Sequence, residues 1–418
     1  MLNLKKNKIR VAQTIKVLVV MLGLLCICAC QPASSQKVTE QEYVPFDVQE
    51  HMKTKKTAFL YRKEEDHFSA VVKLEKNNAV KVDTQHCNQQ YCPLLDSDLF
   101  LKKDATLWGK AKAEEAEYDN RYLRHIPFGS VVLPKQAKLY DDEGKKIATL
   151  KTEQLLPVYE KTDTNYKVEF NHRLVNLPYE ELSDTTLHEQ SFDSRLIAQK
   201  IPVFMYHFFY DENQNETGPD GNYMEIHRFQ EQMRYTKEHG YQSITMAELN
   251  AWMDGKIQIP KGSFVVTMDD NQESVRRLAY PVLEEEQIYA TNFVVTGWID
   301  NADEWKSDYV ELQSHSDGMH IGGCPNIKHG GLFNCIDYQK GLEDVICSKE
   351  KLNGAFVFCY PFGDVDENMK QILRDGGYSL AFTTVFGYVE QGMDKLELPR
   401  VRMSQSTSLD RFAALLEG

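Results

Sequence analysis

The sequence predicts two architectures in one chain: an α/β region over residues 195–418, preceded by an all-β region over residues 54–190. In the later region apolar strand-like runs alternate with helix-spaced segments, which favours parallel strands joined by crossover helices. In the earlier region short alternating apolar runs recur about every 8–12 residues, with turn residues between them. The length of 418 residues allows two or three domains.

The composition and charge of the chain argue against two classes of protein. Hydrophobic residues make up 42% of the chain and charged residues 26%, which is enough apolar material for ordinary cores. The 62 acidic residues outnumber the 48 basic ones, and the net charge of −14 argues against a nucleic-acid partner. Only one long apolar run occurs, so a multispanning membrane protein is excluded.

Residues 1–29 predict a signal peptide, because a basic segment without acids precedes the apolar run Val17–Cys28. The run ends in Ile27-Cys28-Ala29-Cys30, which resembles a bacterial lipobox. That resemblance implies lipidation of Cys30, a tether over residues 30–53, and a protein anchored to the bacterial membrane and facing the cell wall. An uncleaved anchor helix is the alternative, and in either case the body lies outside the cytoplasmic membrane.

Six cysteines follow Cys30. Export permits disulfides, and we consider two pairs, Cys87 with Cys92 and Cys324 with Cys335. The alternative is that all six, including Cys347 and Cys359, are free thiols. No CxxC spacing occurs, so we do not expect them to form a zinc site.

The β region contains a run of short strands around the predicted hairpin turn Asp141–Gly144. The runs are Lys138–Tyr140, Ile147–Leu150, Leu155–Tyr159, Tyr166–Phe170 and Leu174–Val175. They resemble a bacterial SH3-like module, and the runs from Leu60 to Val82 have a similar order, so two diverged copies are an option. Such a module implies wall binding; a spacer or a packing partner of the next domain is the alternative.

The α/β region predicts its elements in order. They are a strand at Ile201–Tyr206, a helix at Glu225–His239 ended by Gly240, a strand at Ser263–Met268, a helix at Ser274–Glu286 broken by Pro281, strands at Thr291–Thr296 and Phe356–Tyr360, a helix at Glu367–Arg374 and a strand at Ser379–Thr383. In such folds the chemistry lies at the strand ends.

Two groups of candidate ligands follow these strands. Asp269 and Asp270 come directly after a buried strand, where one carboxylate can hold a metal while the other takes a proton. A solvated turn is the alternative. His315 and His320 would lie about 140° apart on a helix, but Gly318 permits a turn that brings them together. Two imidazoles and one carboxylate suit Zn²⁺ or a similar ion; two surface histidines are the alternative.

Two further pieces complete the set. His207 ends the first strand of the α/β region, where an imidazole can act as acid or base near neutral pH; a packed core histidine is the alternative. Cys359-Tyr360-Pro361-Phe362-Gly363 places a rigid turn after a strand, and its backbone N–H groups can face an oxyanion; an ordinary turn is the alternative.

Together these pieces resemble the polysaccharide deacetylases, the NodB-homology or carbohydrate esterase family 4 enzymes, over residues 201–416. The resemblance implies a distorted (β/α)7 barrel. Thr267-Met268-Asp269-Asp270-Asn271 matches the family's first motif, Thr-Phe-Asp-Asp-Gly, which implies that Asp269 is the base and Asp270 a metal ligand. His315 and His320 match the second motif and would complete the metal set.

The six-residue histidine segment and Met205-Tyr206-His207 look most like the branch acting on poly-N-acetylglucosamine. In that branch the histidine is the proposed general acid, carried here by His207. Tyr360-Pro361-Phe362-Gly363 matches the third motif, so the backbone N–H near Phe362 would face the oxyanion. Leu398-Pro399-Arg400 matches a late motif, and Arg400 is a candidate partner of Asp269; a plain surface arginine is the alternative.

The chain departs from the family pattern at several positions. Met268 replaces Phe and Asn271 replaces Gly, both of which the turn can tolerate. The arginine that opens the third motif in peptidoglycan-deacetylase branches is absent, with Cys359 nearby. Their late Leu-x-x-His motif is absent too, because no histidine follows His329, and this favours His207 as the acid.

The resemblance implies metal-assisted hydrolysis of the acetamide of N-acetylglucosamine units in a cell-wall or surface polysaccharide, releasing acetate. The expected cofactor is a divalent metal, zinc first, with cobalt or nickel as alternatives, and the expected partners are the glycan and the membrane. Two other functions stay open. One is a glycan-binding lipoprotein on a degenerate deacetylase fold, suggested by Met268 and Asn271; the other is an O-acetyl esterase on the same fold.

Overall fold

The computed structural model describes residues 47–115, 120–182, 187–189, 196–325 and 329–418, which divide into two compact units. Unit 1 takes its described residues from Met1–Tyr118, Ser130–Pro157 and Glu169–His188, and unit 2 from Asp119–Gly129, Val158–Val168 and Glu189–Gly418. The predicted signal peptide, Cys30 and most of the predicted tether lie outside the described residues. In the described part of the chain, no helix has the length and apolarity needed to cross a membrane.

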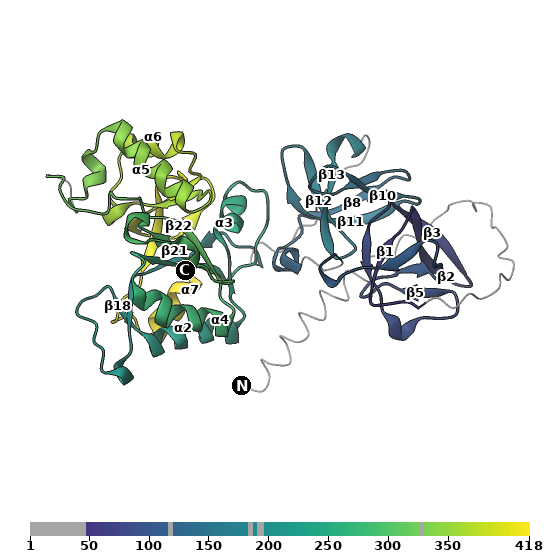
Figure 1. Ribbon diagram of the computed structural model, residues 1–418, viewed down its shortest axis with the longest axis horizontal. Helices are drawn as coiled ribbons and strands as arrows, with labels where there is room; N and C mark the ends of the chain where they lie inside the picture. Colours follow the sequence, from purple (N-terminus) through teal and green to yellow (C-terminus); the bar gives the residue numbers. More distant parts are fainter. Residues whose placement is uncertain (1–46, 116–119, 183–186, 190–195, 326–328) are drawn as a thin grey trace. The chain divides into compact units, whose positions relative to one another are not determined.

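The region before residue 190 consists of β-strands and short 3₁₀ turns, as predicted (Figure 1). Its strands are β1 (His51–Thr54), β2 (Ala58–Glu64), β3 (His67–Leu74), β4 (Ala79–Lys81), β5 (Tyr91–Pro93), β6 (Leu99–Lys102), β7 (Trp108–Lys110), β8 (Gly129–Leu133), β9 (Lys138–Tyr140), β10 (Lys146–Leu150), β11 (Gln154–Lys161), β12 (Asn165–Phe170), β13 (Arg173–Pro178) and β14 (Leu187–Glu189). The pairings described along their length are antiparallel, for example β2 with β3 and β9 with β10. The likeness to an SH3 module stays a prediction.

The hairpin predicted at Asp141–Gly144 joins β9 to β10, where the Gly144 N–H donates to the Asp141 carbonyl at 3.1 Å. Gly144 has φ 75°, a left-handed backbone that glycine adopts without strain. The turn chemistry of the sequence therefore locates this connection correctly.

One of the two cysteine pairs that we considered is a disulfide. Cys87 and Cys92 are bonded, with an S–S distance of 1.98 Å. Cys324, Cys335, Cys347 and Cys359 are free thiols. Cys324 and Cys335 are therefore not bonded to each other, and the second pair that we considered is not a disulfide.

Unit 2 contains, within the described residues, a closed barrel of seven parallel strands, and this confirms the predicted (β/α)7 architecture. The order is β16-β26-β24-β23-β22-β21-β20, and β16 also pairs with β20 to close the ring. The barrel strands are β16 (Val203–Tyr206), β20 (Ser263–Asp269), β21 (Ala290–Val294), β22 (Val310–Ser314), β23 (Val357–Cys359), β24 (Leu380–Phe386) and β26 (Leu398–Arg402). The short strands beside them are β15 (Lys200–Ile201), β17 (Phe208–Tyr210), β18 (Tyr223–Glu225), β19 (Gln242–Ser243) and β25 (Val389–Glu390).

Helices surround the barrel. They are α2 (Ile226–His239), α3 (Met246–Met253), α4 (Tyr280–Glu286), α5 (Tyr338–Lys351), α6 (Glu367–Asp375) and α7 (Leu409–Glu417). Figure 1 shows α2, α4 and α7 grouped together, and α5 beside α6 elsewhere on the barrel. Gly240 ends α2 with φ 75°. Pro281 lies at the start of α4, after a π-helical turn at Val275–Ala279, and the backbone stays helical through Ala279 and Tyr280, so Pro281 does not break the helix.

The strands position the site because they are parallel and their carboxyl ends meet at one edge of the barrel. β20 is buried along its whole length, as expected for a strand with neighbours on both sides. Its last residue is Asp269, while His207 directly follows β16 and His315 directly follows β22. Residues far apart in the sequence are thereby brought to the same edge.

Candidate active site and metal centre

The first feature of the site is a buried ion pair. Arg400 on β26 donates from Nη1 to Asp269 Oδ1 at 2.8 Å and from Nη2 to Asp269 Oδ2 at 2.7 Å. Arg400 is fully buried and Asp269 is 2% exposed. Burial raises the pKa of Asp269, but the charge and hydrogen bonds of Arg400 outweigh it and lower the pKa to about 2. Asp269 is therefore an ionised carboxylate at neutral pH, held by a bidentate partner.

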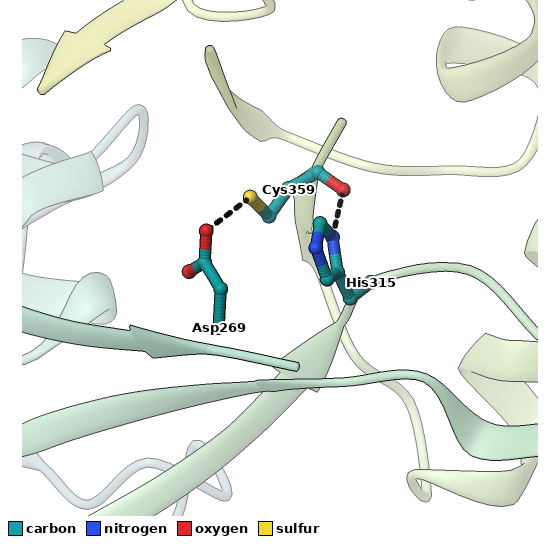
Figure 2. A group of neighbouring side chains, drawn as sticks. All are labelled: Asp269, His315 and Cys359. Atoms are coloured by element: carbon teal, nitrogen blue, oxygen red, sulfur yellow. Dashed lines mark hydrogen bonds between the residues drawn. The ribbon is translucent and has the colours of Figure 1, made fainter. Parts of the chain in front are cut away.

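Cys359 lies between Asp269 and His315 and contacts both, as Figure 2 shows. Its Sγ lies 3.4 Å from Asp269 Oδ2 and accepts from Arg400 Nη2 at 3.1 Å. Burial raises the pKa of the Cys359 thiol well above its usual value, so the thiol keeps its proton and donates to Asp269. The backbone carbonyl of Cys359 is 2.7 Å from His315 Nδ1 (Figure 2). One residue thus contacts both the carboxylate and the imidazole.

The second feature is a convergent set of three side chains. Asp270 Oδ1 lies 3.3 Å from His315 Nε2 and 3.0 Å from His320 Nε2. Two imidazole nitrogens and one carboxylate oxygen therefore share one small volume, within 4.8 Å of one another.

This set fits a divalent metal ion. Asp270 Oδ1 is buried, and no donor among the described residues makes a hydrogen bond to it. The carbonyl of Cys359 can only accept, so it fixes the proton of His315 on Nδ1 and leaves the Nε2 lone pair free towards Asp270. A buried carboxylate oxygen and an imidazole in the ligating tautomer are the donors expected for Zn²⁺ or a similar ion.

His207 lies beside the ion pair. Its Nε2 is 3.9 Å from Asp269 Oδ2, and its side chain is 14% exposed. Its Nδ1 is buried without a hydrogen-bond partner among the described residues. Burial lowers the pKa of His207, although Asp269 and Asp270 act in the opposite direction. The imidazole is therefore neutral near pH 7 and faces the carboxylate.

Aromatic rings border His320. The Phe362 ring stacks on it with centroids 4.8 Å apart, and the Trp298 ring meets it edge-to-face at 5.2 Å. Phe362 has φ 64° and Gly363 has φ 83°, and a Cβ at Gly363 would meet Thr384 Oγ1 at 2.2 Å. This strained turn holds the Phe362 ring over the imidazole. Trp298 is 52% exposed, so one ring of this border is open to solvent.

The turn after β20 accommodates Asn271. Asp270 and Asn271 have φ values of 70° and 31°, in the left-handed region, which Asn and Asp adopt more readily than other non-glycine residues. Asn271 Oδ1 also accepts from the Val295 N–H at 2.8 Å and ties the turn to the end of β21. The side chain that replaces glycine thus has a structural contact of its own.

The structure brings His207, Asp269, Asp270, His315, His320, Phe362 and Arg400 together at the carboxyl edge of the barrel. Two contact residues are not identified by the sequence. Cys359 stands out there only because it is near a missing arginine. Its thiol contacts Asp269 on β20 and Arg400 on β26, although β23 pairs with β22 and β24 and with neither of those strands. Trp298 has no sequence signal that we can identify, because an isolated aromatic residue after a strand is common.

Part of this chain is similar to known proteins. Residues 256–381 match the model of the polysaccharide deacetylase family. A poly-β-1,6-N-acetyl-D-glucosamine N-deacetylase of Staphylococcus epidermidis is 23% identical over 210 residues, covering 45% of this chain and 69% of the relative. The enzyme of the same name from Escherichia coli K12 is 24% identical over 249 residues, covering 48% of this chain and 37% of the relative.

The solved structures to which this chain is similar include IcaB from Ammonifex degensii, at 22% identity and a TM-score of 0.47, covering 53% of this chain and 98% of that one. The Streptococcus pyogenes deacetylase PplD in complex with acetate has 21% identity and a TM-score of 0.44, covering 52% of this chain and 99% of that one.

Proposed function

We propose that this chain is a metal-dependent N-deacetylase of N-acetylglucosamine units in a cell-wall or surface polysaccharide. The match of residues 256–381 to the polysaccharide deacetylase family and the similarity to poly-β-1,6-N-acetyl-D-glucosamine N-deacetylases support this proposal. The observation that carries the proposal is the adjacency of two groups with different chemistry. One is the ionised Asp269 held by Arg400, and the other is the convergent set of Asp270, His315 and His320. Hydrolysis of an amide needs a base and an electrophile side by side.

Asp270, His315 and His320 would hold the divalent ion, with zinc the first expectation and cobalt or nickel as alternatives. A bound ion of this kind supplies a positive charge beside the acetamide carbonyl and lowers the pKa of water. The donor set leaves room for water and substrate, because only three protein ligands converge within the described residues.

The protein's own groups would move the protons. Asp269 accepts the proton of the attacking water, and Arg400 keeps its carboxylate in one orientation. His207 Nε2, 3.9 Å from Asp269 Oδ2, is neutral at rest, so it must gain a proton before it protonates the leaving amine. The proton that Asp269 has accepted from water can pass over this short distance to His207. The backbone N–H near Phe362 is our candidate donor to the carbonyl oxygen.

Acetate release tests this proposal. The full chain would be incubated with β-1,6-linked and β-1,4-linked N-acetylglucosamine oligomers, with crude cell-wall glycan, and with an O-acetylated glycan, each with added Zn²⁺ or with chelator. We expect chelator-sensitive acetate release from an amide-acetylated glycan. The oligomer that releases acetate faster identifies the preferred linkage. Release from the ester alone would instead indicate an O-acetyl esterase. Metal binding without release from any glycan would indicate a binding protein.

The anchor is a separate part of the proposal. The lipobox-like Ile27-Cys28-Ala29-Cys30 supports lipidation of Cys30 and a location on the outer face of the bacterial membrane. The Cys30→Ala variant should move from the membrane fraction to the soluble extracytoplasmic fraction, whereas Cys28→Ala should not. Wall binding by the β-rich region is a further proposal, tested by co-sedimentation of the full chain with purified cell wall.

A further inference from the structure

The segment His315-Ser316-Asp317-Gly318-Met319-His320, here called the histidine turn, has to reverse direction so that both imidazoles face Asp270. Ser316 has φ 77°, in the left-handed region that is uncommon for serine. A residue in that conformation persists only where its surroundings hold it there. The contacts of this turn therefore indicate what positions the two histidines.

The N–H groups at the bend are held by one carboxylate from another element. Asp344 on α5 accepts from the Asp317 N–H at 2.9 Å through Oδ1 and from the Gly318 N–H at 2.7 Å through Oδ2. The flanking N–H groups of Ser316 and Met319 are bonded locally, to the hydroxyls of Ser314 and Ser316, each at 3.2 Å. Asp344 is thus the contact that fixes the bend to the barrel's outer helix.

The opposite side of the turn is closed by backbone. The Thr296 N–H donates to the Ser316 carbonyl at 3.1 Å and the Gly297 N–H to the Asp317 carbonyl at 2.9 Å. A Cβ at Gly297 would lie 2.5 Å from the Asp317 carbonyl oxygen, so the two chain segments are in close contact. The histidine turn thus lies between the segment that follows β21 and helix α5. It cannot move without breaking its hydrogen bonds to Thr296 and Gly297 or those to Asp344.

A carboxylate at the position of Asp344 destabilises the fold. It is 8% exposed, and no basic group in the described parts of the chain lies within ion-pair distance, because Lys351 Nζ bonds to Asp317 Oδ1 at 2.6 Å instead. Burial raises the pKa of Asp344, although its two backbone donors act in the opposite direction. A buried carboxylate with neutral partners costs stability, so packing alone does not account for it.

We propose that Asp344 is a positioning residue of the metal centre: its carboxylate folds the histidine turn into the shape in which His315 and His320 present Nε2 to the same point as Asp270 Oδ1. This inference rests on the proposed metal set. Groups that orient metal ligands typically change metal affinity by about 10–100-fold when they are removed. We expect a loss of that size when Asp344 is replaced.

The test measures metal affinity in the absence of any glycan. The full-length wild type, Asp344→Ala and Asp344→Asn would compete for Zn²⁺ with a chromophoric chelator, and Co²⁺ absorption would report the geometry of the bound ion. Glu343→Ala is the matched control, since it removes the same charge from an exposed neighbour on the same helix. Urea unfolding of each metal-free protein shows whether the variant is folded.

We expect Zn²⁺ affinity to fall about 10–100-fold in Asp344→Ala and by a smaller factor in Asp344→Asn, which keeps the volume and one acceptor oxygen. The Co²⁺ spectrum should change with it, and Glu343→Ala should match the wild type. If Asp344→Ala does not fold, the Zn²⁺ affinity and Co²⁺ spectrum of Asp344→Asn test the inference instead. A folded variant with wild-type affinity and an unchanged Co²⁺ spectrum overturns the inference.

The outcomes separate this inference from the proposed function. A wild type that binds Zn²⁺ through Asp344-dependent affinity but releases no acetate leaves the inference standing and refutes the deacetylase. A wild type that releases acetate while Asp344→Ala binds Zn²⁺ normally refutes the inference and leaves the deacetylase standing. A wild type that binds no Zn²⁺ overturns the inference, and the acetate assay then decides the function by itself.

Discussion

Arg400 keeps the buried carboxylate of Asp269 ionised, so that this carboxylate can accept a proton. An unpaired carboxylate at 2% exposure would favour its neutral form, and a neutral acid cannot accept a proton. The two parallel hydrogen bonds from Arg400 reverse this balance and hold the pKa of Asp269 at about 2. The thiol of Cys359 adds a third donor to the same carboxylate. The carboxylate is thereby ionised and fixed in orientation.

We predict that Arg400→Met lowers the free energy of unfolding by about 3–5 kcal/mol, because it leaves Asp269 buried without its cation. Urea denaturation at neutral pH measures the loss. The double variant Asp269→Asn with Arg400→Met should recover much of it, since no buried charge remains. A single variant as stable as the wild type would show that the pair is not coupled as the structure indicates.

The sequence identified the candidate ligands, the candidate base and Arg400 as a partner of Asp269, but not the contacts of Cys359 and Asp344. Asp269, Asp270, His315 and His320 stand in short motifs that can be found along the chain, whereas Arg400 was found because Leu398-Pro399-Arg400 resembles a late motif of the family. Cys359 and Asp344 act through tertiary contacts between strands and helices far apart in the sequence. Nothing in their immediate neighbours distinguishes them from ordinary buried residues.

Among the helices and strands, the alternating pattern located five of the seven barrel strands within a few residues, but it predicted neither β22 nor β26, and it did not predict α3 or α7. Ser263–Met268 corresponds to β20 and Glu225–His239 to α2, because both carry long apolar patterns. α5 was not predicted. Its buried face consists of Gly341, Asp344, Val345 and Ser348, which have helical spacing but are mostly small or polar. A helix that faces a functional turn gives a weak hydrophobic signal for that reason.

Glu248, at the start of α3, is a half-buried carboxylate whose contacts predict a pH dependence of stability. Glu248 lies 3.1 Å from His125 Nε2 and 3.4 Å from Arg124 Nη2, and it accepts from the Thr245 N–H at 2.8 Å. Burial raises the pKa of Glu248, but these partners outweigh it and lower the pKa. Its stabilising contribution is therefore complete above the unfolded value of about 4.3 and is lost as the pH falls through the lower folded value.

We predict that Glu248→Gln lowers the free energy of unfolding by about 1–2 kcal/mol at pH 7, and that its difference from the wild type shrinks below about pH 4. Urea midpoints measured from pH 3 to pH 7 test this. Glu238→Gln, on the exposed side of α2, should change neither midpoint nor pH dependence. A Glu248→Gln difference that stays constant with pH would mean that the folded protein does not lower the pKa of Glu248.

At the level of the complete chain, two compact units are present, and the candidate metal centre lies wholly in unit 2. Ligand binding stabilises only the unit that binds, by about 2.7 kcal/mol when the free metal is a hundredfold above its Kd. A stabilisation of that size raises the Tm of a domain of roughly 200 residues by about 5–10 °C.

We therefore predict that calorimetry of the chelator-treated chain with and without added Zn²⁺ shows one transition that shifts upward and one that does not. The unshifted transition is an internal reference within the same sample. The shift should disappear in the His315→Ala and His320→Ala variants. An equal shift of both transitions, or a shift that survives both substitutions, would place the metal elsewhere.

The proposed deacetylase depends above all on Asp269 acting as the base beside a bound metal. Acetate release from N-acetylglucosamine oligomers by metal-loaded wild type and Asp269→Asn, with bound metal quantified in both samples, measures this role. We predict that the variant retains its metal and loses activity by about 10²–10⁴-fold, while Asp300→Asn, an exposed control, behaves as the wild type. A metal-loaded Asp269→Asn chain that releases acetate at the wild-type rate would show that Asp269 is not the base.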